Sequence, residues 1–220
     1  MSKRTGMPLL HRIYHAYLVD QNTTAFSDNV AKRYTIGTLE RLAASSDRMS
    51  RRAAVLSLGL FSDYRSNAVL GRALHDPDRG VRMLAENGIR SVWCRSGDPA
   101  QRKSLQAVID LNAARHFESA VKRATNLIAH APWLAEAWNQ RALAHFSRRK
   151  FAESICDCER TLELNPYHFG AATGMAQCHL QLGNRVAALA RFRRALALNP
   201  NLEGVRAHVF YLQRTLKRQE

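Results

Sequence analysis

Cysteine and histidine are the side chains in this sequence that could bind a metal or act as nucleophiles. Four cysteines occur and none forms a Cys-x-x-Cys pair, so neither a zinc ribbon nor a thioredoxin-type redox centre is indicated. Cys156 and Cys158 lie two apart in a predicted helix, which turns their side chains about 200° away from each other. We therefore expect reduced, mostly buried thiols. His11 and His15 could share a helix face but lack a third ligand, and we predict no metal site.

Sequence motifs for catalysis and for nucleotide binding are also absent. The chain has no GxxxxGK[ST], GxGxxG, HExxH or GxSxG motif, each of which would supply a phosphate cradle, a zinc site or an activated nucleophile. We therefore predict a protein that is not an enzyme, with no catalytic residue and no cofactor.

The net charge of +15 is the unusual feature of the composition. Residues 1–100 carry 15 Lys or Arg and 9 Asp or Glu, and residues 101–220 carry 18 and 9, so the excess is spread along the chain. Such a charge favours acidic partners and fast association with them, although it also serves solubility. No long apolar run marks a secretory signal or a membrane span. We expect a soluble cytoplasmic protein that does not insert in a membrane.

Three equally spaced prolines reveal an internal repeat. Pro132, Pro166 and Pro200 are each 34 residues from the next, which defines three units, 101–134, 135–168 and 169–202. Four positions hold small or apolar residues in most units: Ala120, Ser154 and Ala188; Ala124, Cys158 and Phe192; Leu127, Thr161 and Ala195; and Ile128, Leu162 and Leu196.

Each unit is predicted to be a pair of helices. In the middle unit the helices span 135–147 and 151–164, and the proline that follows blocks continuation because it lacks an N–H and disfavours helix in the preceding residue. One such pair cannot bury its own apolar face, so neighbouring pairs must stack. The spacing predicts an all-α protein built as a solenoid.

The middle unit carries the resemblance to a known family. Its packing positions match the tetratricopeptide repeat pattern at Trp138, Ala142, Phe146, Phe151, Ser154, Ile155 and Pro166. The third unit has Gly183 at the turn but Ala172 in place of the tryptophan, and the first unit has Ser104 there. The resemblance implies a right-handed α-α superhelix of helix-turn-helix repeats. It also makes Trp138, Pro132, Pro166 and Pro200 structural residues.

A weaker period of 31 residues occurs upstream, where residues 38–59 can be laid over 69–90. It pairs Asp47 with Asp78 and Arg51 with Arg82, at a turn followed by an apolar helix. This pattern resembles HEAT-type repeats, in which the Asp and Arg stabilise the turn. The resemblance implies HEAT-like repeats over 34–96 and a structural role for these four residues.

The remaining segments are expected to close the ends of the array. Residues 1–33 are predicted to form an N-terminal helical cap, with helical spacing over 9–19 and with Ser27 or Asp28 capping a helix that runs to Leu42. A linker at 96–99 separates the halves, with Ser96 or Asp98 capping the next helix. Residues 203–220 are expected to form a C-terminal capping helix.

In tetratricopeptide arrays the first helix of each unit lines a concave groove. The resemblance therefore implies ligand-binding residues from all units: Arg102, Glu136, Asn139, Gln140, Leu143, Phe146, Gln177 and Tyr211. Amides beside apolar anchors suit an extended peptide or a helix. Asn139 is the most favoured of them, because its amide can bond a peptide backbone.

One subset of the family grips the C-terminal carboxylate of chaperones with Lys, Arg and Asn side chains. Here the corresponding positions hold Leu105, Ile109, Gln140, Gly170 and Gly174, so we do not expect chaperone-tail binding. The sequence favours a protein-interaction adaptor or scaffold whose partner is another protein. The alternative is a basic helical-repeat protein that binds nucleic acid through its arginines, with affinity that falls steeply as salt rises.

Overall fold

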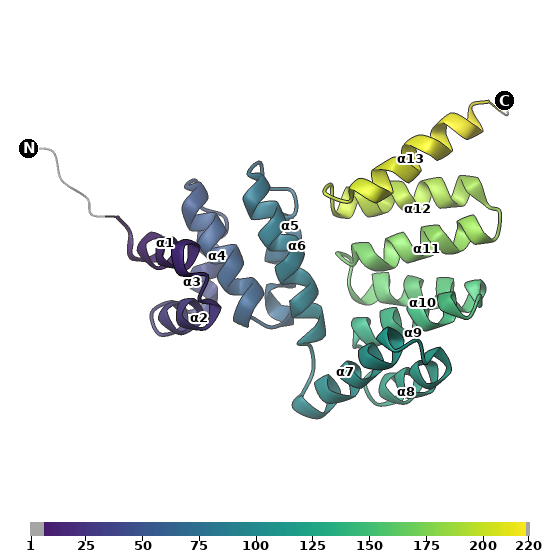
Figure 1. Ribbon diagram of the computed structural model, residues 1–220, viewed down its shortest axis with the longest axis horizontal. Helices are drawn as coiled ribbons and strands as arrows, with labels where there is room; N and C mark the ends of the chain where they lie inside the picture. Colours follow the sequence, from purple (N-terminus) through teal and green to yellow (C-terminus); the bar gives the residue numbers. More distant parts are fainter. Residues whose placement is uncertain (1–6, 219–220) are drawn as a thin grey trace, which may run out of the picture. The chain divides into compact units, whose positions relative to one another are not determined.

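A computed structural model describes residues 7–218 of the chain and shows that they are all-helical, with thirteen α-helices, one short 3-10 helix and no strand (Figure 1). The chain divides into two compact units, Met1–Val92 and Trp93–Glu220. This division falls inside the last turns of a helix, just before the linker expected at 96–99. Residues 1–6 of the expected N-terminal cap and 219–220 of the expected C-terminal helix lie outside the described residues.

The first unit contains α1 (Leu9–Asp20), α2 (Thr23–Ala31), α3 (Ile36–Leu42), α4 (Arg48–Phe61), η1 (Tyr64–Ser66), α5 (Asn67–Ala73) and most of α6 (Arg79–Cys94). The expectation of one helix from Ser27 or Asp28 to Leu42 was wrong. Two helices form instead, because the side chains of Asn22 and Thr35 accept hydrogen bonds from the first turns of α2 and α3. These caps start α2 earlier and begin a separate α3.

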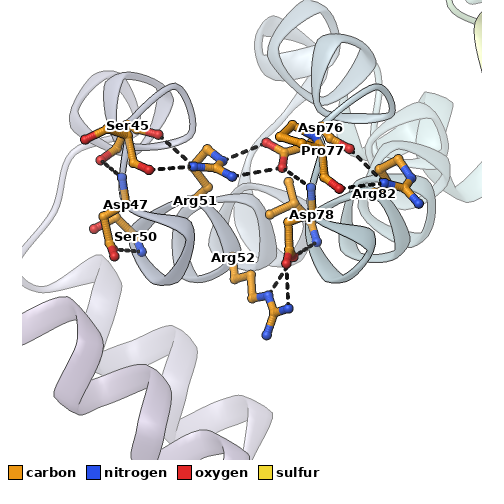
Figure 2. Close-up of polar contacts among 11 residues, drawn as sticks. Ser45, Asp47, Ser50, Arg51, Arg52, Asp76, Pro77, Asp78 and Arg82 are labelled. Carbon is orange, nitrogen blue, oxygen red and sulfur yellow. Dashed lines mark hydrogen bonds and ion pairs between the residues drawn. The ribbon is translucent and has the colours of Figure 1, made fainter.

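The two turns related by the 31-residue period have the same hydrogen bonds (Figure 2). Asp47 accepts from Ser50 N at the start of α4, and Asp78 accepts from Val81 N at the start of α6. Arg51 donates to the two carbonyls that lie five and six residues before it, and Arg82 does the same one period later. Each arginine therefore satisfies carbonyls of the turn that precedes its own helix.

Two ion pairs join these turns. Arg51 Nε lies 2.7 Å from Asp76 Oδ2, and Arg52 Nε lies 2.7 Å from Asp78 Oδ1. Each guanidinium donates two hydrogen bonds to its carboxylate, the geometry that makes such pairs strong. The hydrogen bonds from Arg52 are the main reason that the pKa of Asp78 falls to about 2. Asp78 is thus at once the cap of α6 and the anchor for α4.

Helices α4 and α6 touch through two glycines. A Cβ added to Gly88 would lie 2.7 Å from Gly59 Cα, and one added to Gly59 would lie 2.6 Å from Gly88 Cα. Both obstacles are backbone atoms, so no side chain can move aside to make room. The close approach of the two helices therefore requires glycine at both positions.

We predict that Gly88→Ala lowers the free energy of unfolding by about 2 kcal/mol, because the new methyl overpacks the helix crossing. Thermal and urea unfolding followed by circular dichroism measure the effect. Gly37→Ala is the matched control in α3, where nothing lies within 4 Å of the added Cβ. It should raise stability slightly, since alanine is the better helix former. An equal free energy of unfolding for the two variants would contradict the close contact of α4 and α6 at these glycines.

The second unit contains α7 (Pro99–Ala113), α8 (Phe117–His130), α9 (Ala135–Ser147), α10 (Phe151–Leu164), α11 (Phe169–Gln181), α12 (Arg185–Leu198) and α13 (Glu203–Leu216). The predicted bounds of the middle pair are confirmed. Consecutive helices pack on one another along the unit, with α13 against α12 (Figure 1). Asp98, one of the two expected caps, forms a capping box with Gln101 at the start of α7.

The 34-residue period is visible in the backbone of the turns. The second residue after each first helix adopts a left-handed conformation, at Arg115 (φ 61°), Arg149 (φ 60°) and Gly183 (φ 76°). The next N–H then bonds a carbonyl five residues earlier, which closes the first helix in the same way in all three units. Only the third unit has the glycine that this conformation favours.

Three of the four small or apolar positions that recur with the period are in the core. Ala120, Ser154 and Ala188 are 0–1% exposed, and the positions four and seven residues further on are also buried: Ala124, Cys158, Phe192, Leu127, Thr161 and Ala195. At the fourth position Ile128 is buried, whereas Leu162 and Leu196 are half-buried. Cys156 is exposed while Cys158 is buried, which confirms that the helix turns them apart. Each proline follows the capping residue of the second helix, at positions 132, 166 and 200.

We predict that Arg149→Gly raises the free energy of unfolding by about 0.5 kcal/mol. Relief of the left-handed strain, about 1 kcal/mol, exceeds the added entropy of glycine in the unfolded chain. Arg148→Gly is the control one residue earlier, at φ −86°, and should be neutral or destabilising. Urea titrations measure the free energy of unfolding of both variants. A lower value for Arg149→Gly than for the wild type would contradict the presence of backbone strain at Arg149.

Candidate binding surface on the first helices of the second unit

Helix α9 packs against both α7 and α11 as well as against its sequence neighbours. The first helices of the three repeats are therefore adjacent, although each is separated from the next in sequence by a second helix. Most candidate residues of the sequence analysis lie on these three helices. Their side chains divide into a buried polar cluster and a set that faces solvent.

Glu136 was expected to line the groove, and this expectation needs correction because the residue is only 5% exposed. Its carboxylate lies 3.0 Å from Nε2 of His168, which is 2% exposed. The amides of Asn139 and Gln140 donate to its other oxygen at 2.9 and 2.8 Å. A buried carboxylate is tolerated only when it is paired and hydrogen-bonded in this way, so Glu136 organises the surface from below.

The cluster extends to neighbouring helices on both sides. Nδ1 of His168 accepts from Ala171 N and so caps α11, which leaves Nε2–H to donate to Glu136. On the other side, Asn112 of α7 donates to both the side-chain and backbone oxygens of Gln140. Trp93 stacks on the His168 ring at 4.1 Å between centroids. One chain of contacts therefore joins the end of α6, α7, α9 and α11.

Electrostatics favours the charged form of this carboxyl. Burial by itself would raise the pKa of Glu136, but hydrogen bonds from His168, Gln140 and Asn139 outweigh burial, and the pKa lies below the ordinary 4.5. The hydrogen bonds of the cluster therefore stabilise the ionised carboxylate of Glu136 in the interior of the protein. Asn139 and Gln140 are consequently fixed in orientation by a group that the solvent does not reach.

The other candidates are distributed more widely. Leu143 is 48% exposed on α9, and Gln177 is exposed on α11. Phe146 is half-buried and packs edge-on against Phe151 inside its own repeat. The last two lie apart from these: Arg102 donates to the carbonyl of Gly97, and Tyr211 is 63% exposed on α13.

Trp138 and the prolines contribute packing and closure of the middle unit. The indole Nε1 donates to the carbonyl of Pro132 at 2.9 Å, and the ring packs against the core formed around Leu105. Arg141 lies over the same ring at 4.8 Å and forms a two-pronged ion pair with the buried Asp157. The ion pair thus joins α9 to α10, and the Trp138 ring lies against the paired guanidinium.

Two members of the buried cluster, His168 and Asn112, were missed in the sequence analysis. The 34-residue register contains the signal that could have found them. His168 corresponds to Leu134 and Leu202 in the flanking units, and Asn112 corresponds to Phe146 and Leu180. A polar residue at a position that is apolar in the other repeats requires a buried partner.

Within residues 7–218, no three His, Cys, Asp or Glu side chains come together in a way that would hold a metal ion. His11 instead contacts Ser50 and Asp47, at 2.9 and 2.8 Å. None of the helices in the described part of the chain combines the length and hydropathy that crossing a bilayer demands.

Comparison with known proteins gives both a sequence and a fold similarity. No protein-family model matches the chain. It is 31% identical over 125 residues to a TPR repeat-containing protein of Rhizobium etli, covering 57% of this chain and 60% of that protein. It is 32% identical over 95 residues to the Hsp70-Hsp90 organizing protein of Triticum aestivum, covering 43% of this chain and 16% of that protein. The chain thus spans 60% or less of these curated relatives.

Among solved structures, the chain is similar to the first TPR of Spaghetti (RPAP3) bound to the HSP90 peptide SRMEEVD. The TM-score is 0.51 at 20% identity, over 53% of this chain and 93% of that one. This similarity shows the fold. The helix pairs and the turns that recur every 34 residues agree with this fold.

We predict that Glu136→Gln lowers the free energy of unfolding by about 1–3 kcal/mol at neutral pH, because a neutral amide leaves one buried donor without an acceptor. A folded-state pKa below 4.5 means that ionised Glu136 contributes stability above that pH and loses it as the pH falls. The wild-type free energy should therefore drop more steeply than that of the variant below about pH 4.5. Urea titrations across this range test both statements, and parallel pH profiles would contradict the assignment.

Proposed function

We propose that this protein is a non-enzymatic adaptor that binds an extended peptide segment of another protein across α7, α9 and α11. The observation that carries the proposal is the adjacency of these first helices, with Leu143 and Gln177 exposed above a buried polar cluster that fixes the amides between them. The TPR structure of similar fold is bound to a peptide, which supports a peptide as the kind of ligand.

The chemistry of the surface suits a peptide backbone. The Asn139 side chain donates to Glu136, which fixes the amide and orients its oxygen as an acceptor for a peptide N–H. Leu143 lies one helical turn further along α9 and offers an apolar contact. A surface that is already ordered loses little conformational entropy on binding.

The charged grip on a C-terminal carboxylate is not part of the proposal. Leu105 is fully buried at one of the expected positions, and Ile109 packs against the core around it. Neither position presents a cation to a ligand. We therefore expect recognition through amides and apolar contacts, with little dependence on a free chain end.

We also propose that residues 34–96 are HEAT-like repeats that extend the scaffold. The support is the pair of matching turns at Asp47 and Asp78, with Arg51 and Arg82 in equivalent positions. In this proposal the first unit has a structural role, and the peptide surface belongs to the second unit.

We predict that Leu143→Glu combined with Gln177→Glu weakens peptide binding about tenfold or more, because charges replace an apolar anchor and an amide at the centre of the surface. Peptides enriched on the full-length chain from a displayed random library provide the probes, and isothermal titration calorimetry measures one of them. These positions are preferable to Asn139 and Gln140, where a new carboxylate would repel the buried Glu136 and unfold the site.

Leu182→Glu combined with Val186→Glu supplies the matched control, because it adds the same two charges at residues that are 54% and 69% exposed outside the first helices. The peptide SRMEEVD is tested in parallel and is expected to bind far more weakly than the enriched peptides. Failure to enrich any peptide, or equal binding by the double variant and the control, would refute the proposed surface.

A further inference from the structure

The end of the second unit has a charge distribution unlike the rest of the chain. Residues 185–218 contain one acidic residue, Glu203, and eight basic ones: Arg185, Arg191, Arg193, Arg194, Arg206, Arg214, Lys217 and Arg218. This segment therefore holds +7 of the net +15. None of the ion pairs found among the described residues involves a basic side chain of this segment.

Helix α13 presents part of this charge beside two exposed aromatic rings. Val205 and Leu212 are buried and mark the face that packs on the unit. Phe210 is 68% exposed and Tyr211 is 63% exposed. The helical turn of 100° per residue places both rings on the outward side of α13. Large apolar rings exposed together beside polar residues are a common mark of an interaction site.

The outward residues form a recess of defined shape. Ala207, Phe210, Tyr211 and Arg214 occupy positions i, i+3, i+4 and i+7, the four corners of a hole that accepts one side chain of a facing helix. Viewed down the axis of α13, Ala207 and Arg214 lie between the directions of the two rings, and all four residues are exposed. The alanine keeps the middle of this hole shallow and open. Arg206, Lys217 and Arg218 surround it with positive charge.

We propose that this outward face of α13 is a docking surface for an acidic amphipathic helix of another protein. A leucine or similar apolar residue of the partner fills the hole between Phe210 and Tyr211, and its flanking carboxylates pair with the arginines around the hole. Charge complementarity excludes a second copy of this chain as occupant, because the same cationic face or the +15 surface would repel it.

Single-stranded nucleic acid fits the geometry less well. Proteins that bind it stack successive bases on rings spaced along a groove. Here the two rings flank one hole on a rigid helix, which matches the insertion of a single side chain. The surface is distinct from the peptide surface on α7, α9 and α11, and Tyr211 is the only candidate groove residue that it includes.

The test uses the full-length chain and a fluorescein-labelled synthetic helix of about four turns, with leucines at heptad a and d positions and glutamates at most others. Fluorescence anisotropy at low salt should show saturable binding. Phe210→Ser with Tyr211→Ser should weaken it at least tenfold, and Arg214→Glu about tenfold. Lys32→Glu, an exposed lysine of the first unit, makes the same change in net charge and should have little effect.

Two further probes and one further variant separate the alternatives. A peptide with serines replacing the leucines keeps the charge but removes the anchor, and its binding should be weak. Leu143→Glu with Gln177→Glu should leave binding of the acidic helix unchanged, so the peptide surface and the α13 surface are tested independently. Equal weakening by Lys32→Glu and Arg214→Glu would overturn the proposal. The proposal would also be overturned if the chain bound a single-stranded oligonucleotide and not the acidic helix, and if Phe210→Ser with Tyr211→Ser abolished the binding of that oligonucleotide.

Discussion

The buried pair of Glu136 and His168 is the interaction on which the second unit depends most. Removing one partner would leave a charge or a polar ring in an interior that water does not reach, which costs far more than the pair itself contributes. The two residues lie 32 positions apart, Glu136 on α9 and His168 at the N-cap of α11. Their pairing, together with the stacked Trp93 and the amide of Asn112 joined through Gln140, therefore fixes how neighbouring repeats sit on one another.

The two units stabilise the turns between their helices with different interactions. In the first unit, charged side chains satisfy the turns: Arg51 and Arg82 bind carbonyls, and Asp47 and Asp78 cap helices. In the second unit, the backbone closes its own turns through a left-handed residue, and small side chains let the helices approach. Surface charges in the second unit are therefore less committed to structure, which leaves the arginines near its end available for a partner.

Much of the second unit could be predicted because its repeat is visible in the sequence as a regular spacing of prolines and small residues. Proline stops a helix wherever it occurs, and a small residue every 34 positions marks a helix contact. The division between α2 and α3 was missed because it depends on which polar residue caps a helix, and several candidates compete within a few residues. Among the candidate site residues, Glu136 was wrongly expected to be accessible in the groove. Helical register assigns a residue to a face of the helix, but it does not determine how deeply the side chain is buried.

The helix pairs, their period and the positions that must be buried follow from proline geometry and from the spacing of apolar residues along the chain. Which polar residues lie inside depends on how the helices pack in three dimensions. Register alone does not bring His168 to Glu136 or Asn112 to Gln140, because each contact joins one first helix to the next and depends on how closely these helices pack. It is this burial that turns two amides of α9 into fixed features of a surface, and that leaves Phe210 and Tyr211 outside.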